Sequence, residues 1–347
     1  MSSYAVLDDA LGSIRDAGPE MRSGLTNHAP MAIEALCALD RGDAVAAWLE
    51  RYRPGMLPQP PAVERIRSGE WRSALSREER FADWHQLITN ELKDASWPEV
   101  LDRWTPRLAP GISAAATHGV IRVGHAARAL AEAATSMRLE ELALGIAYWA
   151  STYQGLPTTF DAYPANDPRQ AIYAVPLVPV DQRKFTGTIT SSLAALDRFP
   201  AFASVIGHAR LDGDPAATVS QLTETFARAY LANAHDPLHV IVFIHTVTSA
   251  TAVRSLLPHV SEASGRLLLP YLWQAEAALY ATFGSRAAPS DPVETPAQSR
   301  DELIAMAVAH GDEHVIKFTE ACLREDAINP SPVYRAAAAH AIKMITA

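Results

Sequence analysis

The residues best suited to chemistry are histidines that lie inside apolar helical segments, where a polar ring needs a specific partner. The chain has twelve histidines, and the densest group is AHGDEHVIKF (309–318). On one continuous helix His310, His314 and Lys317 have the spacing i, i+4 and i+7, so they project from one stripe, with Glu313 at its edge. The segment therefore predicts a cluster of metal-binding or proton-transferring groups.

Lys317 is one of four lysines in the chain and stands between apolar residues. A lysine on an inward-facing stripe must lose its charge, find a carboxylate or be chemically altered. A neutral amine captures carbon dioxide, and the resulting carbamate is an anionic oxygen ligand that suits a metal bound by histidines. The alternative is that the stem of Lys317 packs while its ammonium group extends to solvent. The sequence leaves both interpretations open.

The same stretch contains HxxEH, formed by His310, Glu313 and His314. In zinc proteases of the inverted type this pattern supplies two ligands and a glutamate base. Gly311 inside the motif is unfavourable for the helix that such a site needs. A zinc-dependent hydrolase is therefore kept as an alternative hypothesis.

A second group is THGVIRVGHAARAL (117–130), which contains His118, Arg122 and His125. The two histidines are seven residues apart, or about 10 Å along a helix, so they cannot both bind one metal ion. Arg122 lies between them and is suited to hold an anionic oxygen. The alternative is that both histidines are core residues satisfied by neighbouring carbonyl groups.

Two further histidines lie in apolar surroundings. His245 follows the apolar run of PLHVIVFIHTVTSA (237–250), and His28 stands at the start of a helix, where it either caps the helix or points inward. His235 and His239 flank a turn at Asp236-Pro237, so their i, i+4 spacing is coincidental. Four separate helices thus each bring one histidine, and convergence of helices on a buried metal ion is common in helical proteins.

The elements that must position these side chains are helical, because apolar residues recur at helical spacing along most of the chain. The sequence predicts an all-α fold, a single irregular multi-helix domain covering residues 1–347. The prolines of 155–187 predict a long loop of the functional kind, and the composition of 286–299 predicts a flexible linker. Only 171–180 has an extended pattern. Helices are expected over 30–39, 45–52, from a capping box at 76–79, and over 113–137, 139–153, 191–195, 216–232, 238–257, 266–283, 301–326 and 332–346.

Composition excludes several classes of protein. The chain has 347 residues, 48% of them apolar, and a net charge of −9, which argues against nucleic acid as a partner. Two cysteines indicate a reducing compartment. No apolar run of about 18 residues and no basic, apolar leader are evident, so we expect a cytoplasmic protein without a membrane partner. GxGxxG, GxxxxGK[ST] and GxSxG motifs are absent, which leaves no sign of nucleotide-binding loops or an α/β-hydrolase elbow.

Four motifs taken in order resemble those of the questin oxidase-like family, oxygenases of aromatic polyketide pathways. They are NHAPMAIEAL (27–36), HGVIRVGHA (118–126), FIHTVTSATAVRSLLP (243–258) and DEHVIKFTEAC (312–322). The resemblance implies oxygen insertion of the Baeyer–Villiger type, or ring cleavage, on an anthraquinone-like substrate with O2. It matches less clearly over 155–235, where we expect substrate specificity to reside.

The resemblance also implies a non-haem Fe(II) centre held by His28, His118, His245, His314 and a carboxylated Lys317. Five ligands leave one position of an octahedron for dioxygen. Family members are described as NADPH-linked, so NADPH is a further implied cofactor, although the chain lacks a nucleotide motif. Arg122 and His125 are the expected catalytic residues, as stabilisers of a developing oxyanion. Expected pocket walls for a flat aromatic substrate are Trp48, Trp149, Tyr153, Phe160 and Tyr163.

Two other functions stay open. One is the zinc-dependent hydrolase with Glu313 as the base. The other is a non-catalytic helical protein that binds a small aromatic ligand. The role of His310 differs between these hypotheses, because only the hydrolase uses it as a ligand.

Overall fold

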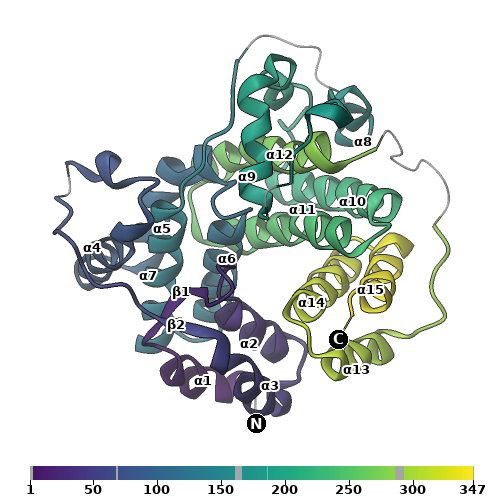
Figure 1. Cartoon of the computed structure of the whole chain (residues 1–347). Coiled ribbons are helices and arrows are strands. Elements are labelled where there is room, and N and C mark those ends of the chain that lie inside the picture. Colours follow the sequence, from purple (N-terminus) through teal and green to yellow (C-terminus); the bar gives the residue numbers. More distant parts are fainter. Residues whose placement is uncertain (1–2, 68, 161–165, 186, 286–292, 347) are drawn as a thin grey trace.

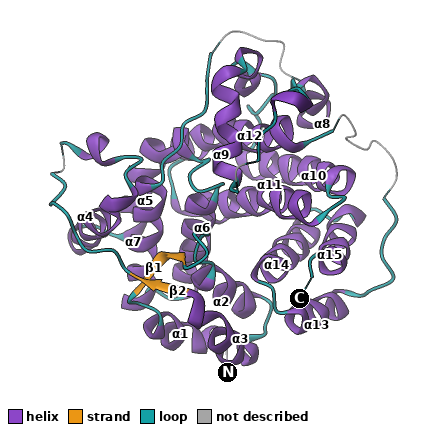
Figure 2. Cartoon of the chain, in the orientation of Figure 1, coloured by secondary structure: helices purple, strands orange, loops and turns teal. Residues whose placement is uncertain are grey.

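A computed structural model describes residues 3–67, 69–160, 166–185, 187–285 and 293–346 (Figure 1). These residues are mostly helical with one small two-stranded antiparallel sheet (Figure 2), so the all-α prediction is confirmed. The elements are α1 (Leu7–Ser13), β1 (Ala17–Met21), α2 (Ala29–Ala38), α3 (Val45–Tyr52), β2 (Met56–Pro58), α4 (Phe81–Asp94), α5 (Trp97–Leu108), α6 (His118–Glu132), α7 (Ser136–Ser151), α8 (Pro168–Ala171), α9 (Ile189–Leu193), α10 (Pro215–Asn233), α11 (Pro237–Leu256), α12 (Glu262–Phe283), α13 (Arg300–His310), α14 (Glu313–Ile328) and α15 (Pro332–Met344).

Helix α11 is the centre of the fold and packs against α6, α10, α12 and α14 (Figure 1). With the turn that follows it, this segment (Pro237–His259) is apolar and long enough to cross a membrane, contrary to the sequence expectation. However, 78% of its most apolar stretch is buried inside the protein. Contact with helices on several sides therefore accounts for its composition, since a helix that is apolar all round is a core helix.

Several helix boundaries differ from those expected. The segment 113–137 is not one helix, because residues 115–117 form a turn with positive φ and α6 begins at His118. The segment 301–326 is divided at Gly311, which ends α13 in the left-handed conformation with φ of 81°. Ser76 starts no helix and has a φ of 56°. The capping boxes of the described chain are instead those of α5 and α13.

The proline-rich loop contains some regular structure. Its described residues include α8 and a 3₁₀ turn, Ile172–Ala174, so the expected extended segment at 171–180 begins as a helix and forms no strand. The strand β2 lies where a loop was expected. In the linker predicted over 286–299, residues 286–292 lie outside the described residues. The single-domain organisation stays a prediction, although one buried apolar cluster includes residues from Leu7 to Ile345.

A buried carboxyl group makes the stability of the fold depend on pH. Glu276 on α12 is fully buried, and one of its oxygens accepts a hydrogen bond from Ser249 at 3.3 Å. Its other oxygen has no partner among the described residues. Burial raises the pKa of Glu276 well above its usual 4.5. The folded state therefore binds a proton that the unfolded chain releases, so this residue's contribution to stability is lost as the pH rises above about 4.5.

We predict that Glu276→Gln raises the melting temperature at about pH 8 and changes it little at about pH 5. The amide keeps the shape of the side chain and has no ionised form. At the higher pH, the free energy of unfolding should rise by about 1.4 kcal/mol for each tenfold by which burial weakens the acid dissociation of Glu276. Thermal melts at both pH values measure it, and an equal change at both would contradict this explanation.

Candidate metal centre

Four helices, α2, α6, α11 and α14, bring one histidine each to the same position in the interior. His28 is the N-cap of α2, His118 is the first residue of α6, His245 lies within α11, and His314 is the second residue of α14. Ring centroids are 4.5 Å apart for His28 and His118, 4.6 Å for His28 and His314, and 4.7 Å for His118 and His245. One ligand atom from each of His28, His118 and His314 lies within 4.8 Å of the other two. The structure thus brings all four predicted histidines together.

The orientations of His118 and His245 are fixed by backbone carbonyl groups. Nδ1 of His118 lies 2.5 Å from the carbonyl oxygen of Ala115, and Nδ1 of His245 lies 2.6 Å from that of Ile241. A carbonyl oxygen only accepts, so both Nδ1 atoms hold the proton and both Nε2 atoms present lone pairs. These Nε2 atoms face each other at 3.3 Å with no proton between them. Two facing lone pairs call for a cation, and an Nδ1–H bonded to a backbone carbonyl oxygen is typical of metal-binding histidines.

The electrostatics keep these rings neutral. Burial lowers the pKa of His28 and of His118 well below the usual 6.5, and it lowers that of His245 to about 3. Neighbouring cationic groups act in the same direction. The N-termini of α2, α6 and α14 also meet here, and their partial positive charges disfavour imidazolium. Neutral imidazoles are the form that coordinates a metal ion.

Lys317 enters the cluster. It is 3% exposed, and its Nζ lies 3.1 Å from Nδ1 of His28. The interpretation that its ammonium group reaches solvent is therefore wrong. No carboxylate oxygen of a described residue comes within 4.0 Å of this nitrogen, and burial lowers the pKa of Lys317 to about 8. A substantial fraction of the amine is thus neutral near physiological pH.

The break at Gly311 changes the expected stripe. Asp312 caps the new helix α14 by accepting hydrogen bonds from the backbone of His314 and Val315, at 2.8 and 3.2 Å. Trp48 holds the turn, because its Nε1 donates to the carbonyl oxygen of Gly311 at 2.7 Å. His314 and Lys317 remain on one helix, whereas His310 ends the preceding one.

Consequently HxxEH is not a zinc site in this structure. Nε2 of His310 lies 2.9 Å from the carbonyl oxygen of Ile345, to which it donates, and His310 belongs to neither of the two groupings of ligand atoms in the described chain. The first grouping consists of His28, His118 and His314, and the second consists of Asp312, Glu313 and His314.

The donor set fits a divalent transition metal. Nδ1 of His314 is buried, makes no hydrogen bond to a described residue and lies 3.4 Å from a carboxylate oxygen of Asp312. Glu313 adds a carboxylate beside the rings, with Oε1 at 3.9 Å from Nδ1 of His28 and at 3.8 Å from Nδ1 of His314. Imidazole and carboxylate donors of this kind suit iron, zinc and copper. In the sequence Glu313 stands at the edge of the predicted stripe, a position that did not indicate it as a ligand candidate.

Arg122 and His125 point away from the histidine cluster, and neither lines the cavity beside it. Nε and Nη2 of Arg122 donate to the two carboxylate oxygens of Glu141 on α7, at 2.6 and 2.9 Å. Nδ1 of His125 lies 2.6 Å from a carboxylate oxygen of Glu34. Arg122 is thus engaged in a buried ion pair and His125 in a hydrogen bond to a buried carboxylate, which does not support the expected role at an oxyanion.

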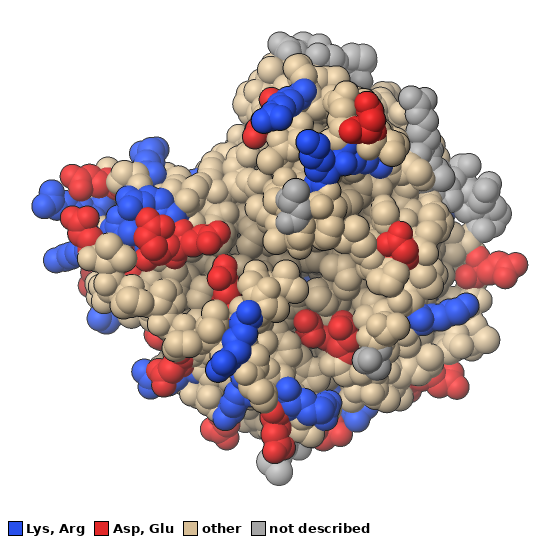
Figure 3. Space-filling view, in the orientation of Figure 1, with Lys and Arg blue, Asp and Glu red and all other residues tan. Residues whose placement is uncertain are grey.

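A cavity of about 740 Å³ lies beside the cluster and is lined by His28, His118, His245 and His314. Figure 3 shows the molecule hollowed near the middle of the drawn face, with acidic groups at the edge of the hollow. The charged side chains among the lining residues are acidic. The remaining walls combine apolar groups with hydroxyl groups, and they include Met21, Leu25, Thr26, Tyr52, Ala115, Ala116, Tyr148, Phe185, Thr188, Ile189, Thr190, Leu238 and Ile241.

The aromatic walls differ from those expected. Trp48, Trp149 and Tyr153 do not line this cavity, Phe160 is 75% exposed, and Tyr163 lies outside the described residues. The aromatic walls are Tyr52, Tyr148 and Phe185, which the sequence analysis did not single out.

Tyr52 stands directly beside the histidines. Its hydroxyl oxygen accepts a hydrogen bond from the backbone N–H of His28 at 2.9 Å, and its ring stacks on Trp48 at 4.7 Å. Burial and the charge of Glu313 raise the pKa of Tyr52. The phenol therefore stays protonated, and its own O–H, which has no acceptor among the described residues, can donate into the cavity.

The fold and the site define an all-helical protein with a buried polyhistidine cluster next to a large cavity. The chain belongs to the Questin oxidase-like family, whose sequence model matches residues 25–322. Membership implies an oxygenase-type oxidoreductase. In the comparison with curated proteins, no sequence matches the chain.

We predict that His245→Ala weakens Co(II) binding by more than about 100-fold, which exceeds the loss typical of outer-shell changes. The matched control is His310→Ala, which removes a histidine that bonds the carbonyl oxygen of Ile345 and the backbone N–H of Asp312 and belongs to neither grouping of ligand atoms; Co(II) affinity should stay unchanged. Titration followed by visible absorption measures the affinity, and melts of the metal-free proteins show that both variants fold. Wild-type affinity in His245→Ala, with loss in His310→Ala, would support the zinc hydrolase instead.

Proposed function

We propose that the protein is a non-haem, iron-dependent oxygenase that acts on an aromatic polyketide such as an anthraquinone and uses O2 for oxygen insertion or ring cleavage. One observation supports this above all others: the Nε2 atoms of His118 and His245 face each other at 3.3 Å in the interior, with His28 and His314 completing the group. Iron is chosen over other metals because of the family, since the donor set by itself accepts several.

His28, His118, His245 and His314 would hold the ion, with a carboxylated Lys317 as the fifth ligand. When bound, the ion supplies the one-electron chemistry that dioxygen requires. The neutral amine of Lys317 attacks the carbon of CO2, forming an N–C bond and releasing one proton to solvent. The resulting anion removes the cost of a buried ammonium group, and the three helix N-termini stabilise it.

The cavity suits a flat, largely apolar ring system with several oxygen substituents. Its apolar walls exclude water, and its hydroxyl groups orient phenols and carbonyls. Tyr52, rather than Arg122 or His125, is the candidate oxyanion donor, because its O–H lies beside the histidines and can donate to a developing oxyanion. The described lining has no lysine or arginine, so it offers no charged partner for the phosphates of NADPH.

The function is tested with Fe(II)-loaded protein, a hydroxyanthraquinone in its quinone or reduced form, and ¹⁸O₂. We expect oxygen uptake and a product that contains ¹⁸O. His245→Ala is the control and should show neither. If the wild type binds both iron and the anthraquinone but takes up no oxygen with either form, the protein is a ligand-binding protein rather than an oxygenase.

The same assay tests Tyr52. Tyr52→Phe should lower the turnover rate by about 100-fold, as for the loss of one oxyanion donor, without changing Co(II) affinity. Tyr148→Phe is the matched control, because the Tyr148 hydroxyl already bonds to Thr26 at 2.8 Å. Equal losses in the two variants would show that Tyr52 has no special role.

The state of Lys317 is tested by ¹³C NMR of the metal-loaded diamagnetic Zn(II) protein in ¹³C-bicarbonate. We expect a protein-bound carbamate signal in the wild type and none in Lys317→Ala. In His310→Ala, which keeps the lysine and its surroundings, the signal should persist. A wild-type spectrum without the signal would show that Lys317 acts as a free amine.

A further inference from the structure

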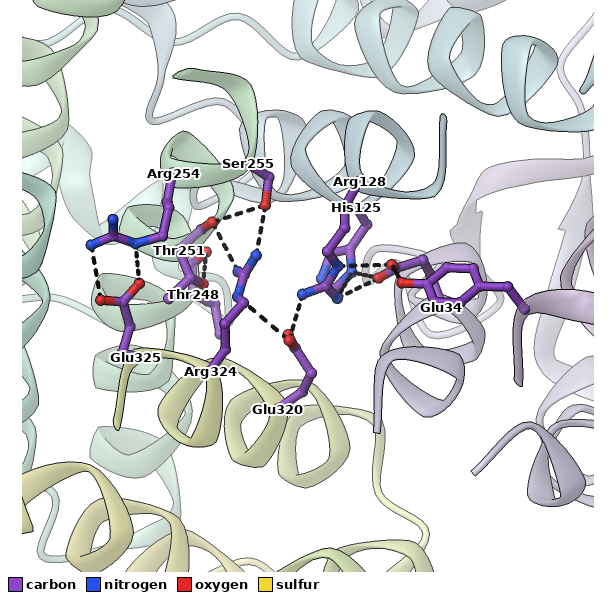
Figure 4. A network of polar contacts seen from close by, with 11 residues as sticks. Glu34, His125, Arg128, Thr248, Thr251, Arg254, Ser255, Glu320, Arg324 and Glu325 are labelled. Carbon is purple, nitrogen blue, oxygen red and sulfur yellow. Dashed lines mark hydrogen bonds and ion pairs between the residues drawn. The ribbon is translucent and has the colours of Figure 1, made fainter. Parts of the chain in front are cut away.

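A second cluster of buried charged groups, drawn in Figure 4, lies about two helical turns from the histidines along the same helices, and none of its residues lines the cavity. It joins Glu34 on α2, His125 and Arg128 on α6, and Glu320 and Arg324 on α14. Arg324 extends it to α11, where it donates to the backbone oxygen of Thr251 at 2.9 Å and to the hydroxyl of Ser255 at 2.8 Å. The elements linked are thus the same four helices that bring the histidines together.

The histidines form one layer, here called the upper layer, and the charged groups form the lower layer. The distance between the two layers is nearly the same on each helix. The first residue of the lower layer follows the histidine of the upper layer by six or seven positions, or about 9–10 Å along the helix axis. The pairs are His28 and Glu34 on α2, His118 and His125 on α6, His245 and Thr251 on α11, and His314 and Glu320 on α14.

The bonds within this lower layer are directional. Glu34 accepts hydrogen bonds from Tyr4 at 2.5 Å, from His125 at 2.6 Å, and from Nε and Nη2 of Arg128 at 2.8 and 2.5 Å. Nη1 of the same guanidinium donates to Glu320. Arg128 thus links two carboxylates that belong to different helices, and its planar fork fixes the angle between them as well as the distance.

The charges of the layer balance. Burial acts to raise the pKa of Glu34, but Arg128 and His125 outweigh it and hold the pKa well below its usual range. Burial also lowers the pKa of His125, so its ring is neutral. Two carboxylates then face two guanidinium groups. Buried pairs of this kind add little net stability compared with apolar packing, whereas removing a single partner is costly.

We propose that this charged layer is a positioning device for the histidine cluster above it, and that Arg128 is its central positioning residue. The inference rests on the proposed function, because it assigns the layer a role in metal binding. Apolar helix faces tolerate small sliding movements, whereas charged hydrogen bonds do not. The layer therefore holds the four ligand helices at the spacing that brings Nε2 of His118 and His245 face to face.

The chain offers a matched control in Arg122. Arg122 is on the same helix, and its pair with Glu141 is also buried and bidentate. That pair joins α6 to α7, which holds none of the four histidines. Arg128→Met and Arg122→Met each remove one guanidinium from a buried pair on α6, so both should lower the melting temperature of the metal-free protein.

Only Arg128→Met should alter the metal centre. We expect a changed visible spectrum of the Co(II) protein and an affinity about 10- to 100-fold weaker, as for other outer-shell changes. Arg122→Met should keep the wild-type spectrum and affinity. Glu320→Gln provides a second variant if Arg128→Met fails to fold, because it loosens α14 and leaves the Arg128–Glu34 pair in place.

Two results would overturn the inference in different ways. Wild-type Co(II) affinity and spectrum in folded Arg128→Met or Glu320→Gln would show that the layer only stabilises the fold. Absence of Co(II) binding by the wild-type protein would overturn the proposed metal centre and this inference with it.

Discussion

The structure depends on one constraint: imidazole rings that face one another inside an apolar helical protein must be satisfied. The backbone carbonyl oxygens of Ala115 and Ile241 accept hydrogen bonds from Nδ1 of His118 and of His245. The Nε2 atoms of the two rings then face each other at 3.3 Å. An unsatisfied buried polar group costs about 1–3 kcal/mol. A cation at this position would satisfy several such groups together, and the surrounding helices are arranged so that they meet there.

The local backbone serves the same constraint. Residues 115–117 have positive φ, which is unfavourable for non-glycine residues, and this turn brings the carbonyl of Ala115 against His118. Gly311 ends one helix so that α14 can begin with His314 at its N-terminus. Strain and a helix break therefore occur where two of the four rings enter the cluster, and the charged layer around Arg128 links the same helices further along.

Much of the fold and the cluster could be predicted from the sequence, because helical periodicity and histidines in apolar surroundings are local signals. The break at Gly311 also had a local signal, since glycine followed by aspartate ends one helix and caps the next. No local signal in the sequence indicated the directions in which the side chains of Arg122 and His125 point. Periodicity places a residue on a helix face but does not reveal that Glu141 or Glu34 lies opposite. Tyr52 likewise joins the site through the packing of α3 against α2, which brings its hydroxyl to the backbone N–H of His28.

Elemental analysis of the protein purified without added metals or chelators tests most directly whether the histidine cluster is a metal centre. We expect about one iron per chain, because separate helices then build one buried site. A chain that contains only trace metal, and that takes up none after anaerobic loading with Fe(II), would contradict it.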